Sequence, residues 1–237
     1  MRSLIVALAF LTRLPMPRLA ADARDFARAV RLYPVAGLAI GVLVAGAGWL
    51  GGRIDPWLGA LAATTLWIWA TGALHLDGLG DVADGLGAAH GDRTRLLQVM
   101  RDPHIGSFGV TAIALQLAAK LVLLHLVLPT SWLALIAIPA AARLGPLAWA
   151  RFLPPLRDSG LGASIAGAIT LPILAAWGLA LAAACLLLPP LATAPVLIGA
   201  FGWWAHHRLG GVTGDVHGAG IELVETGLLL AFALRLG

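Results

Sequence analysis

The sequence contains little charge and almost no cysteine. Asp, Glu, Lys and Arg make up 12% of the 237 residues, whereas soluble domains have about 25%. The single cysteine, Cys185, excludes a disulfide framework and a cysteine-based metal site. Apolar residues are abundant, at 59% of the total, and the mean hydropathy is +0.88. This composition predicts one integral membrane domain, 1–237, with no separate soluble domain.

The basic residues are not clustered as they are on nucleic-acid-binding surfaces, although the net charge is +4 and the pI about 10.5. We therefore expect the lipid bilayer as a partner and no nucleic acid. The N-terminus, MRSLIVALAFLTRLPMP, is similar to a signal peptide, but Arg13 follows its apolar stretch and it lacks a small-residue cleavage site. Residues 1–34 are interpreted as a retained interfacial or re-entrant segment.

Apolar stretches predict an all-α, polytopic helical bundle with about six to seven transmembrane helices, because an open sheet edge cannot satisfy its backbone in lipid. Two of the stretches are short and predict broken or tilted spans. The predicted spans are Val35–Leu50, Trp57–Leu74, Phe108–Leu128, Trp132–Ala150, Leu171–Leu188, Pro195–Ala205 and Leu223–Leu236.

The connections between these spans alternate in charge. Twelve of the 16 basic residues fall in the N-terminal segment and in alternate connections, which the positive-inside rule assigns to the cytoplasm. Most of the acidic residues fall on the same side. The sequence thus predicts cytoplasmic active-site loops at 75–106 and 206–222, with the C-terminus on the opposite side.

Three carboxylates follow one of the apolar stretches, in the segment TGALHLDGLGDVADGLGAAHG. On a helix, the spacing of Asp77, Asp81 and Asp84 places them within an arc of about 60° on one face. Three carboxylates on one face favour a divalent cation, and Mg²⁺ takes oxygen ligands together with substrate phosphates. The glycines between them leave room for a bulky ligand. The alternative is a solvated loop whose acids face water.

A second polar cluster, GDRTRLLQVMRDPHIGSFG, precedes the third span. Arg101 and the neighbouring Asp102 are candidates for substrate binding, since arginine suits phosphate oxygens. Gly106 and Ser107 are expected at a helix N-terminus, where free N–H groups bind anions. The alternative is an amphipathic helix on the membrane surface whose arginines face lipid headgroups.

The third cluster, HHRLGGVTGDVHGAGIELVE, forms a predicted glycine-rich turn between two short spans. Asp215 and Glu222 are candidates for a general base or for supporting a metal site. Two cations lie inside spans, where charge is expensive. Lys120 is interpreted as a snorkelling side chain or a buried one, and Arg143 is expected to pair with a nearby acid or a substrate phosphate.

Two classes of function agree with these residues. One is a membrane enzyme in which a metal assists transfer between a diphosphate-activated donor and an acceptor. The other is a cation-coupled transporter, which requires acids near the bilayer midplane and commonly an inverted repeat. The acids gather at one face and no repeat is evident, so the sequence favours the enzyme.

The motifs HLDGLGDVADGL, VMRDPHIGSFGV and GGVTGDVHGA resemble those of the adenosylcobinamide-GDP ribazoletransferase family, also called cobalamin synthases. The segments FLTRLPMP and LYPVAGLAIG are similar to that family as well, and the resemblance covers about residues 10–226. Gly80 and Val82 depart from the residues expected in many members, and no carboxylate is lost. CDP-alcohol phosphotransferases are a related alternative, but their DG-x2-AR element is absent.

This resemblance implies a Mg²⁺-dependent enzyme of the bacterial inner membrane. It would join adenosylcobinamide-GDP to α-ribazole, or to its 5′-phosphate, and release GMP. The expected metal ligands are Asp77, Asp81 and Asp84, with Asp215 or His75 as the base. Substrate binding is expected to involve a further set of residues, and self-association is left open. That set is Arg101, Asp102, Gly106, Ser107, Arg143 and Glu222.

Overall fold

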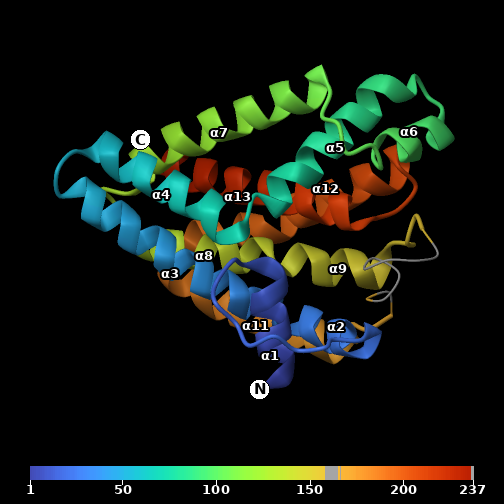
Figure 1. The fold of residues 1–237 in the computed structure, drawn as a ribbon. Coiled ribbons are helices and arrows are strands. Elements are labelled where there is room, and N and C mark those ends of the chain that lie inside the picture. The colour runs from blue at the N-terminus through green and yellow to red at the C-terminus, as the bar shows by residue number, and fades with distance from the viewer. Residues whose placement is uncertain (158–164, 166, 236–237) are drawn as a thin grey trace.

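A computed structural model describes residues 1–157, 165 and 167–235, and these residues form a helical bundle (Figure 1). An isolated bridge between Pro155 and Val212 is the one strand-like contact among them. The predicted all-α fold is therefore confirmed. The helices are α1 (Arg2–Leu11), α2 (Ala23–Ala29), η1 (Val30–Leu32), α3 (Tyr33–Gly52), α4 (Pro56–Thr71), α5 (Leu74–Ala89), α6 (Arg93–Val99), α7 (Ser107–Val127), α8 (Trp132–Ala142), α9 (Leu144–Phe152), α11 (Leu171–Leu187), η2 (Pro189–Thr193), α12 (Ala194–Arg208) and α13 (Gly214–Leu234).

Four helical stretches are long and apolar enough to cross a membrane. They are Ala23–Gly52, Ser107–Val127, Trp132–Phe152 and Gly214–Leu234. The pair α4 and α5 adds a fifth if it counts as one broken span. The remaining apolar helices are shorter, which is why this count is below the six to seven expected from hydropathy. The predicted end of the last span, Leu236, lies outside the described residues.

A sharp hinge separates α4 from α5, whose axes differ by 84°. Gly72 and Ala73 both adopt the left-handed conformation, with φ of 60° and 59°. That conformation is unusual for alanine and costs on the order of 1 kcal/mol. The backbone N–H of Arg13 donates to the carbonyl of Ala70 at 2.7 Å, which ties the N-terminal segment to this hinge. The bend turns α5 away from the direction of α4.

Helix α13 lies at the centre of the bundle and packs against α5, α7, α8, α9 and α12. Helices α3 and α8 approach so closely that a side chain at Gly37 or Gly41 would collide with the α8 backbone. Close backbone approach at small residues is the usual packing mode in membranes. Every residue of α11 is at least partly exposed, so this apolar helix is suited to face lipid.

The two segments expected to be loops are largely helical. Residues 75–106 contain most of α5 and all of α6, and residues 206–222 contain the end of α12 and the first turns of α13. Of the glycines that suggested a turn around Asp215, Gly210 and Gly211 lie in the connection before α13, with positive φ. The others lie within α13, where they allow close packing. Gly220, for example, lies against the ring of Trp149. The chemistry of both segments is therefore carried on helices, which hold side chains more rigidly than loops do.

Candidate functional site

The three carboxylates of α5 do not share one environment. Asp77 is exposed and Asp81 is half-buried, whereas Asp84 is buried. Asp77 and Asp84 both lie close enough for their negative charges to act on Asp81. The three residues therefore lie on one face of α5, as predicted from their spacing. That face is exposed at Asp77 and buried at Asp84.

Asp84 caps the N-terminus of α7. Its Oδ2 accepts the backbone N–H of Gly106 at 2.7 Å, and its Oδ1 accepts that of Gly109 at 2.8 Å. A carboxylate in this position satisfies two orphan N–H groups and interacts favourably with the helix dipole. Helix α7 begins at Ser107, as predicted. Asp84 therefore occupies two of the N–H groups that the expected phosphate site at this terminus would use.

Asp215 faces α5 from the first turn of α13. The two helices touch at Gly78, where an added Cβ would lie 2.6 Å from the carbonyl oxygen of Asp215. Only glycine permits this approach, and it brings the negative charge of Asp215 within range of Asp81. Thr213 donates to the Oδ2 of Asp215 at 3.3 Å, and Arg157 Nη2 lies 3.5 Å from the same oxygen.

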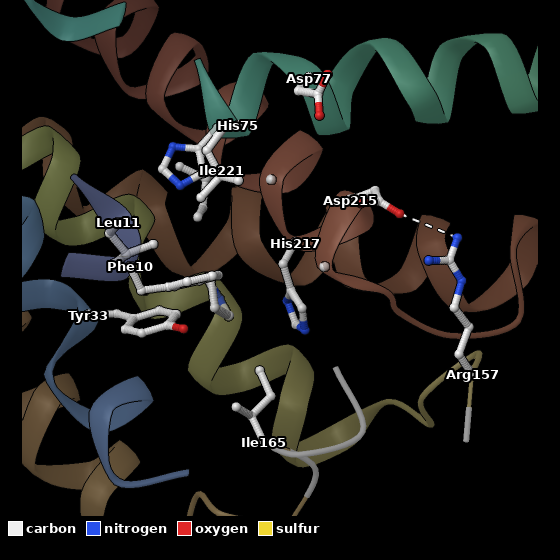
Figure 2. A pocket seen from close by; sticks show the side chains of 14 residues that line it. Phe10, Leu11, Tyr33, His75, Asp77, Arg157, Ile165, Asp215, His217 and Ile221 are labelled. Atoms are coloured by element: carbon white, nitrogen blue, oxygen red, sulfur yellow. Dashed lines mark ion pairs between the residues drawn. The ribbon is translucent and has the colours of Figure 1, made fainter. Parts of the chain in front are cut away.

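A cavity of about 290 Å³ opens between α1, α3, α5, α9 and α13. Figure 2 shows Asp77, Asp215 and Arg157 along one side of it. The opposite side is apolar and partly aromatic. It is lined by Phe10, Leu11, Tyr33, Pro146 and Ile221.

Two buried histidines line the same cavity. His75 is 2% exposed and His217 is 7% exposed. The Nε2 atom of His75 and both ring nitrogens of His217 find no hydrogen-bond partner among the described residues. Most buried polar atoms in proteins are hydrogen-bonded. Unpartnered nitrogens beside a cavity therefore indicate a site that a ligand or water fills.

A buried ionic cluster links α7 and α13 to the α8–α9 junction. Lys120 Nζ is 2.7 Å from Glu222 and 2.6 Å from Glu225, and Arg143 Nη1 is 2.7 Å from the other oxygen of Glu225. The side-chain amide of Gln116 donates to Glu222 at 2.8 Å. Two cations thus balance two anions. This pairing meets the requirement that intramembrane charges be compensated.

This cluster corrects two of the predicted roles and settles two open alternatives. Glu222 forms an ion pair with Lys120, accepts a hydrogen bond from Gln116 and does not line the cavity, so it is not positioned to bind substrate. Arg143 is fully buried and pairs with Glu225, which makes the acid, not a phosphate, its partner. Lys120 is 3% exposed and lies over the ring of Trp67 at 4.4 Å, so it does not snorkel.

Arg101 and Asp102 lie apart from the cavity. Both are exposed in the connection between α6 and α7 and neither contributes to the cavity lining. The backbone N–H and imidazole of His104 hold the pKa of Asp102 below its usual value by hydrogen bonding. Asp102 is therefore an ionised surface carboxylate that is hydrogen-bonded to His104.

The acids near the cavity mouth are compatible with a metal that arrives with its substrate. Among the described residues, no three His, Cys, Asp or Glu side chains converge as a metal site. Asp84 is hydrogen-bonded to the N-terminus of α7. Asp77 and Asp81, on adjacent turns of α5, remain available to a metal. Mg²⁺ is commonly held by one or two carboxylates plus substrate phosphates and water. The residues present fit that open type of site.

Several cavity residues were not anticipated as site residues. Phe10 and Tyr33 lie in two segments similar to the family, but neither residue was assigned a role, and Arg157 was one of the basic residues of the predicted cytoplasmic connections. What these residues share is their position in the fold, because packing between segments distant in sequence brings each of them to the cavity.

Comparison with known proteins gives one consistent result. The family model for cobalamin-5-phosphate synthase matches residues 3–233. A protein of Novosphingobium aromaticivorans is 54% identical over 99% of this chain and 97% of its own length. Relatives from Thiobacillus denitrificans and Pseudomonas aeruginosa are 51% and 40% identical over 100% and 99% of this chain, and over 96% and 98% of their own lengths. All three are named adenosylcobinamide-GDP ribazoletransferase. No solved structure was found to match the chain.

Proposed function

Since this chain belongs to the cobalamin-5-phosphate synthase family, we propose that it performs the transfer for which its relatives are named. It joins adenosylcobinamide-GDP to α-ribazole, or to the 5′-phosphate of α-ribazole, and releases GMP. The observation that carries this proposal is the meeting of α5 and α13 at Gly78, which sets Asp77 and Asp215 together at the mouth of a ligand-sized cavity. The site lies at the cytoplasmic face of the bacterial inner membrane.

The reaction is a displacement at phosphorus. A ribose hydroxyl of the acceptor attacks the phosphorus nearest the corrinoid, so an acceptor that carries a 5′-phosphate keeps it in the product. The bond from that phosphorus to the bridging oxygen breaks, and the bridging oxygen leaves with GMP. The attacking hydroxyl also releases a proton, which needs a base. The negative charge that develops on the phosphoryl oxygens and on GMP needs a cation nearby.

Asp77 and Asp81 are the residues we assign to Mg²⁺. The ion would neutralise charge on the diphosphate, which is its usual contribution in phosphoryl transfer. Asp77 faces the cavity and Asp81 lies one turn further along α5, so a diphosphate bound there would reach both carboxylates. Asp84 is excluded from this role by its two hydrogen bonds to α7.

Asp215 is the proposed base for the attacking hydroxyl, and Arg157 the proposed cation for the departing phosphate. Both line the cavity on the same side as Asp77. Asp215 is oriented by Thr213 at 3.3 Å. The distance of 3.5 Å between Arg157 and Asp215 is long for an ion pair, and both side chains are partly exposed. Arg157 can therefore move to a phosphate oxygen without leaving the charge of Asp215 deeply buried and unpaired. Arginine suits this task because its guanidinium binds phosphate through two N–H groups.

The decisive experiment is release of GMP from adenosylcobinamide-GDP by membranes that contain the protein, with and without α-ribazole and Mg²⁺. We expect GMP only when all three are present. Asp77→Asn and Asp81→Asn should each raise the Mg²⁺ concentration needed for half-maximal rate by tenfold or more. Asp55→Asn is a matched control, because Asp55 caps α4 and asparagine is an equally good cap. Near-wild-type Mg²⁺ dependence in folded Asp81→Asn would refute the metal assignment.

A further inference from the structure

His75 presents one ring nitrogen to the protein and the other to the cavity. Its Nδ1 lies 3.5 Å from Nη2 of Arg143. Its Nε2 is buried and has no partner among the described residues, and the residue lines the cavity. In Figure 2 the imidazole lies near Leu11 and Phe10, on the side away from Asp215. The proton of neutral His75 must sit on one of these two nitrogens.

Arg143 decides which nitrogen carries it. Its Nη1 donates to Glu225 at 2.7 Å and to the carbonyl of Pro139 at 2.7 Å, so the guanidinium is held in place. A guanidinium has only N–H donors and stays charged. The nitrogen that faces it must therefore be the acceptor. It follows that Nδ1 of His75 is unprotonated and that the proton resides on Nε2, which faces the cavity.

This tautomer excludes the catalytic role first considered for His75. A nitrogen that already carries its proton cannot take another from the acceptor, so Nε2 cannot act as a base. It is instead a hydrogen-bond donor without a protein acceptor. A buried donor left unsatisfied is unfavourable, and a ligand that offers an acceptor atom at this position would relieve that cost.

The surroundings define the kind of acceptor group. Phe10 and Tyr33 stack with ring centroids 6.1 Å apart, and with Leu11 they make this side of the cavity apolar. His217 stacks against Trp149, which holds its ring at the cavity wall. A sugar or phosphate would leave polar groups unsatisfied here, whereas a flat heterocycle would not. At about 290 Å³ the cavity is at the small end of ligand pockets, roughly 300–1,000 Å³, and a corrinoid is far too large for it.

We propose that the cavity binds the aromatic base of the acceptor nucleoside and that His75 donates its Nε2–H to the base's free ring nitrogen. His75 is then a binding residue that places the acceptor's ribose toward Asp77 and Asp215. This inference rests on the proposed function, since it assumes a benzimidazole nucleoside as acceptor. It adds the site of the base, the identity of the donor and the exclusion of His75 as the general base.

The test compares two acceptors and three forms of the protein. One acceptor is α-ribazole, and the other is its indole analogue, in which a C–H replaces the free ring nitrogen. Equilibrium dialysis with solubilised protein gives Kd for each, and GMP release gives KM and kcat. For the wild type we expect the analogue to bind about tenfold more weakly, the typical effect of one lost hydrogen bond. The kcat values should be similar.

The variants separate a donor from a base. His75→Gln retains an N–H near the position of Nε2, so it should keep most of the preference for α-ribazole and a kcat within a few-fold of wild type. His75→Leu should bind the two acceptors equally. If His75→Gln folded but lost 100-fold or more in kcat at unchanged Kd, His75 would be the base and the inference would be wrong.

Two further results are informative. A preference for α-ribazole that persists in His75→Leu would also overturn the inference, because the donor would then lie elsewhere. If His75→Leu does not fold, His75→Gln alone decides between donor and base. A wild-type protein that shows the preference in dialysis but releases no GMP would support the inference and refute the proposed function, so the two failures remain distinct.

Discussion

Replacement of Asp84 distinguishes a helix cap from a metal ligand. The carboxylate accepts two backbone N–H groups of α7, at 2.7 and 2.8 Å. Asparagine retains one acceptor oxygen but turns an NH₂ group toward the second N–H, and it removes the charge that favours the helix dipole. A hydrogen bond to a charged group contributes ~1.5–3 kcal/mol, so Asp84→Asn should destabilise the protein by ~2 kcal/mol. Asp84→Ala, which leaves both N–H groups unsatisfied, should cost more.

For a chain of this size, 1 kcal/mol corresponds to ~2–4 °C in Tm. Asp84→Asn should therefore lower Tm by ~4–8 °C. The nine tryptophans allow unfolding to be followed by intrinsic fluorescence in detergent. At temperatures well below Tm, the Mg²⁺ dependence of GMP release should match the wild type. Asp77→Asn should behave in the opposite way, because Asp77 is exposed, with Tm nearly unchanged and a higher Mg²⁺ requirement.

The reasoning would be refuted by Asp84→Asn protein that melts at the wild-type temperature. It would also be refuted if the variant needed tenfold more Mg²⁺ for half-maximal rate. The first result would mean that the contacts with α7 contribute little to stability, and the second that the carboxylate binds the metal.

Three other changes follow from the same structure. Lys120→Met should lower the free energy of unfolding by ~3–5 kcal/mol, because it leaves an excess buried carboxylate. The double variant Lys120→Met, Glu222→Gln should recover much of the accompanying loss in Tm. No recovery would show that the two charges are not coupled. Gly78→Ala should reduce GMP release strongly, since its Cβ would collide with the backbone of α13. Gly46→Ala is the control and should leave GMP release unchanged, because nothing lies within 4 Å of the added Cβ. Equal activity of the two variants would contradict the α5–α13 contact. Arg157→Gln should lower kcat by at least tenfold with Tm almost unchanged, as measured by GMP release and fluorescence melting, and an unchanged kcat would remove Arg157 from the site.

Much of the fold could be predicted because its causes are local. Apolar runs of the length of a bilayer determine helices. The spacing of Asp77, Asp81 and Asp84 was sufficient to place them on one helix face. The start of α7 at Ser107 was also predicted correctly, since helix N-termini have a recognisable pattern. Fewer helices than apolar runs have the full length of a span, because α11, for example, is apolar but only 17 residues long.

The partner of each charged side chain could not be predicted in this way. A carboxylate suits a metal, a helix N-terminus or a buried cation equally well, and only packing decides which of these it meets. Asp84 meets a helix start 22 residues away, and Lys120 meets Glu225 from 105 residues away. No sequence pattern links such positions.

The sequence by itself determined an all-α membrane protein with acids gathered on one helix face and motifs of one transferase family. The tertiary structure alone decided which of those acids remain free for chemistry. It also brought Tyr33, His75 and His217 together around one cavity and placed Arg143 beside Nδ1 of His75. The physical reason is that helix periodicity orders residues within a few turns, whereas hydrogen bonds and ion pairs between helices depend on how the whole chain packs.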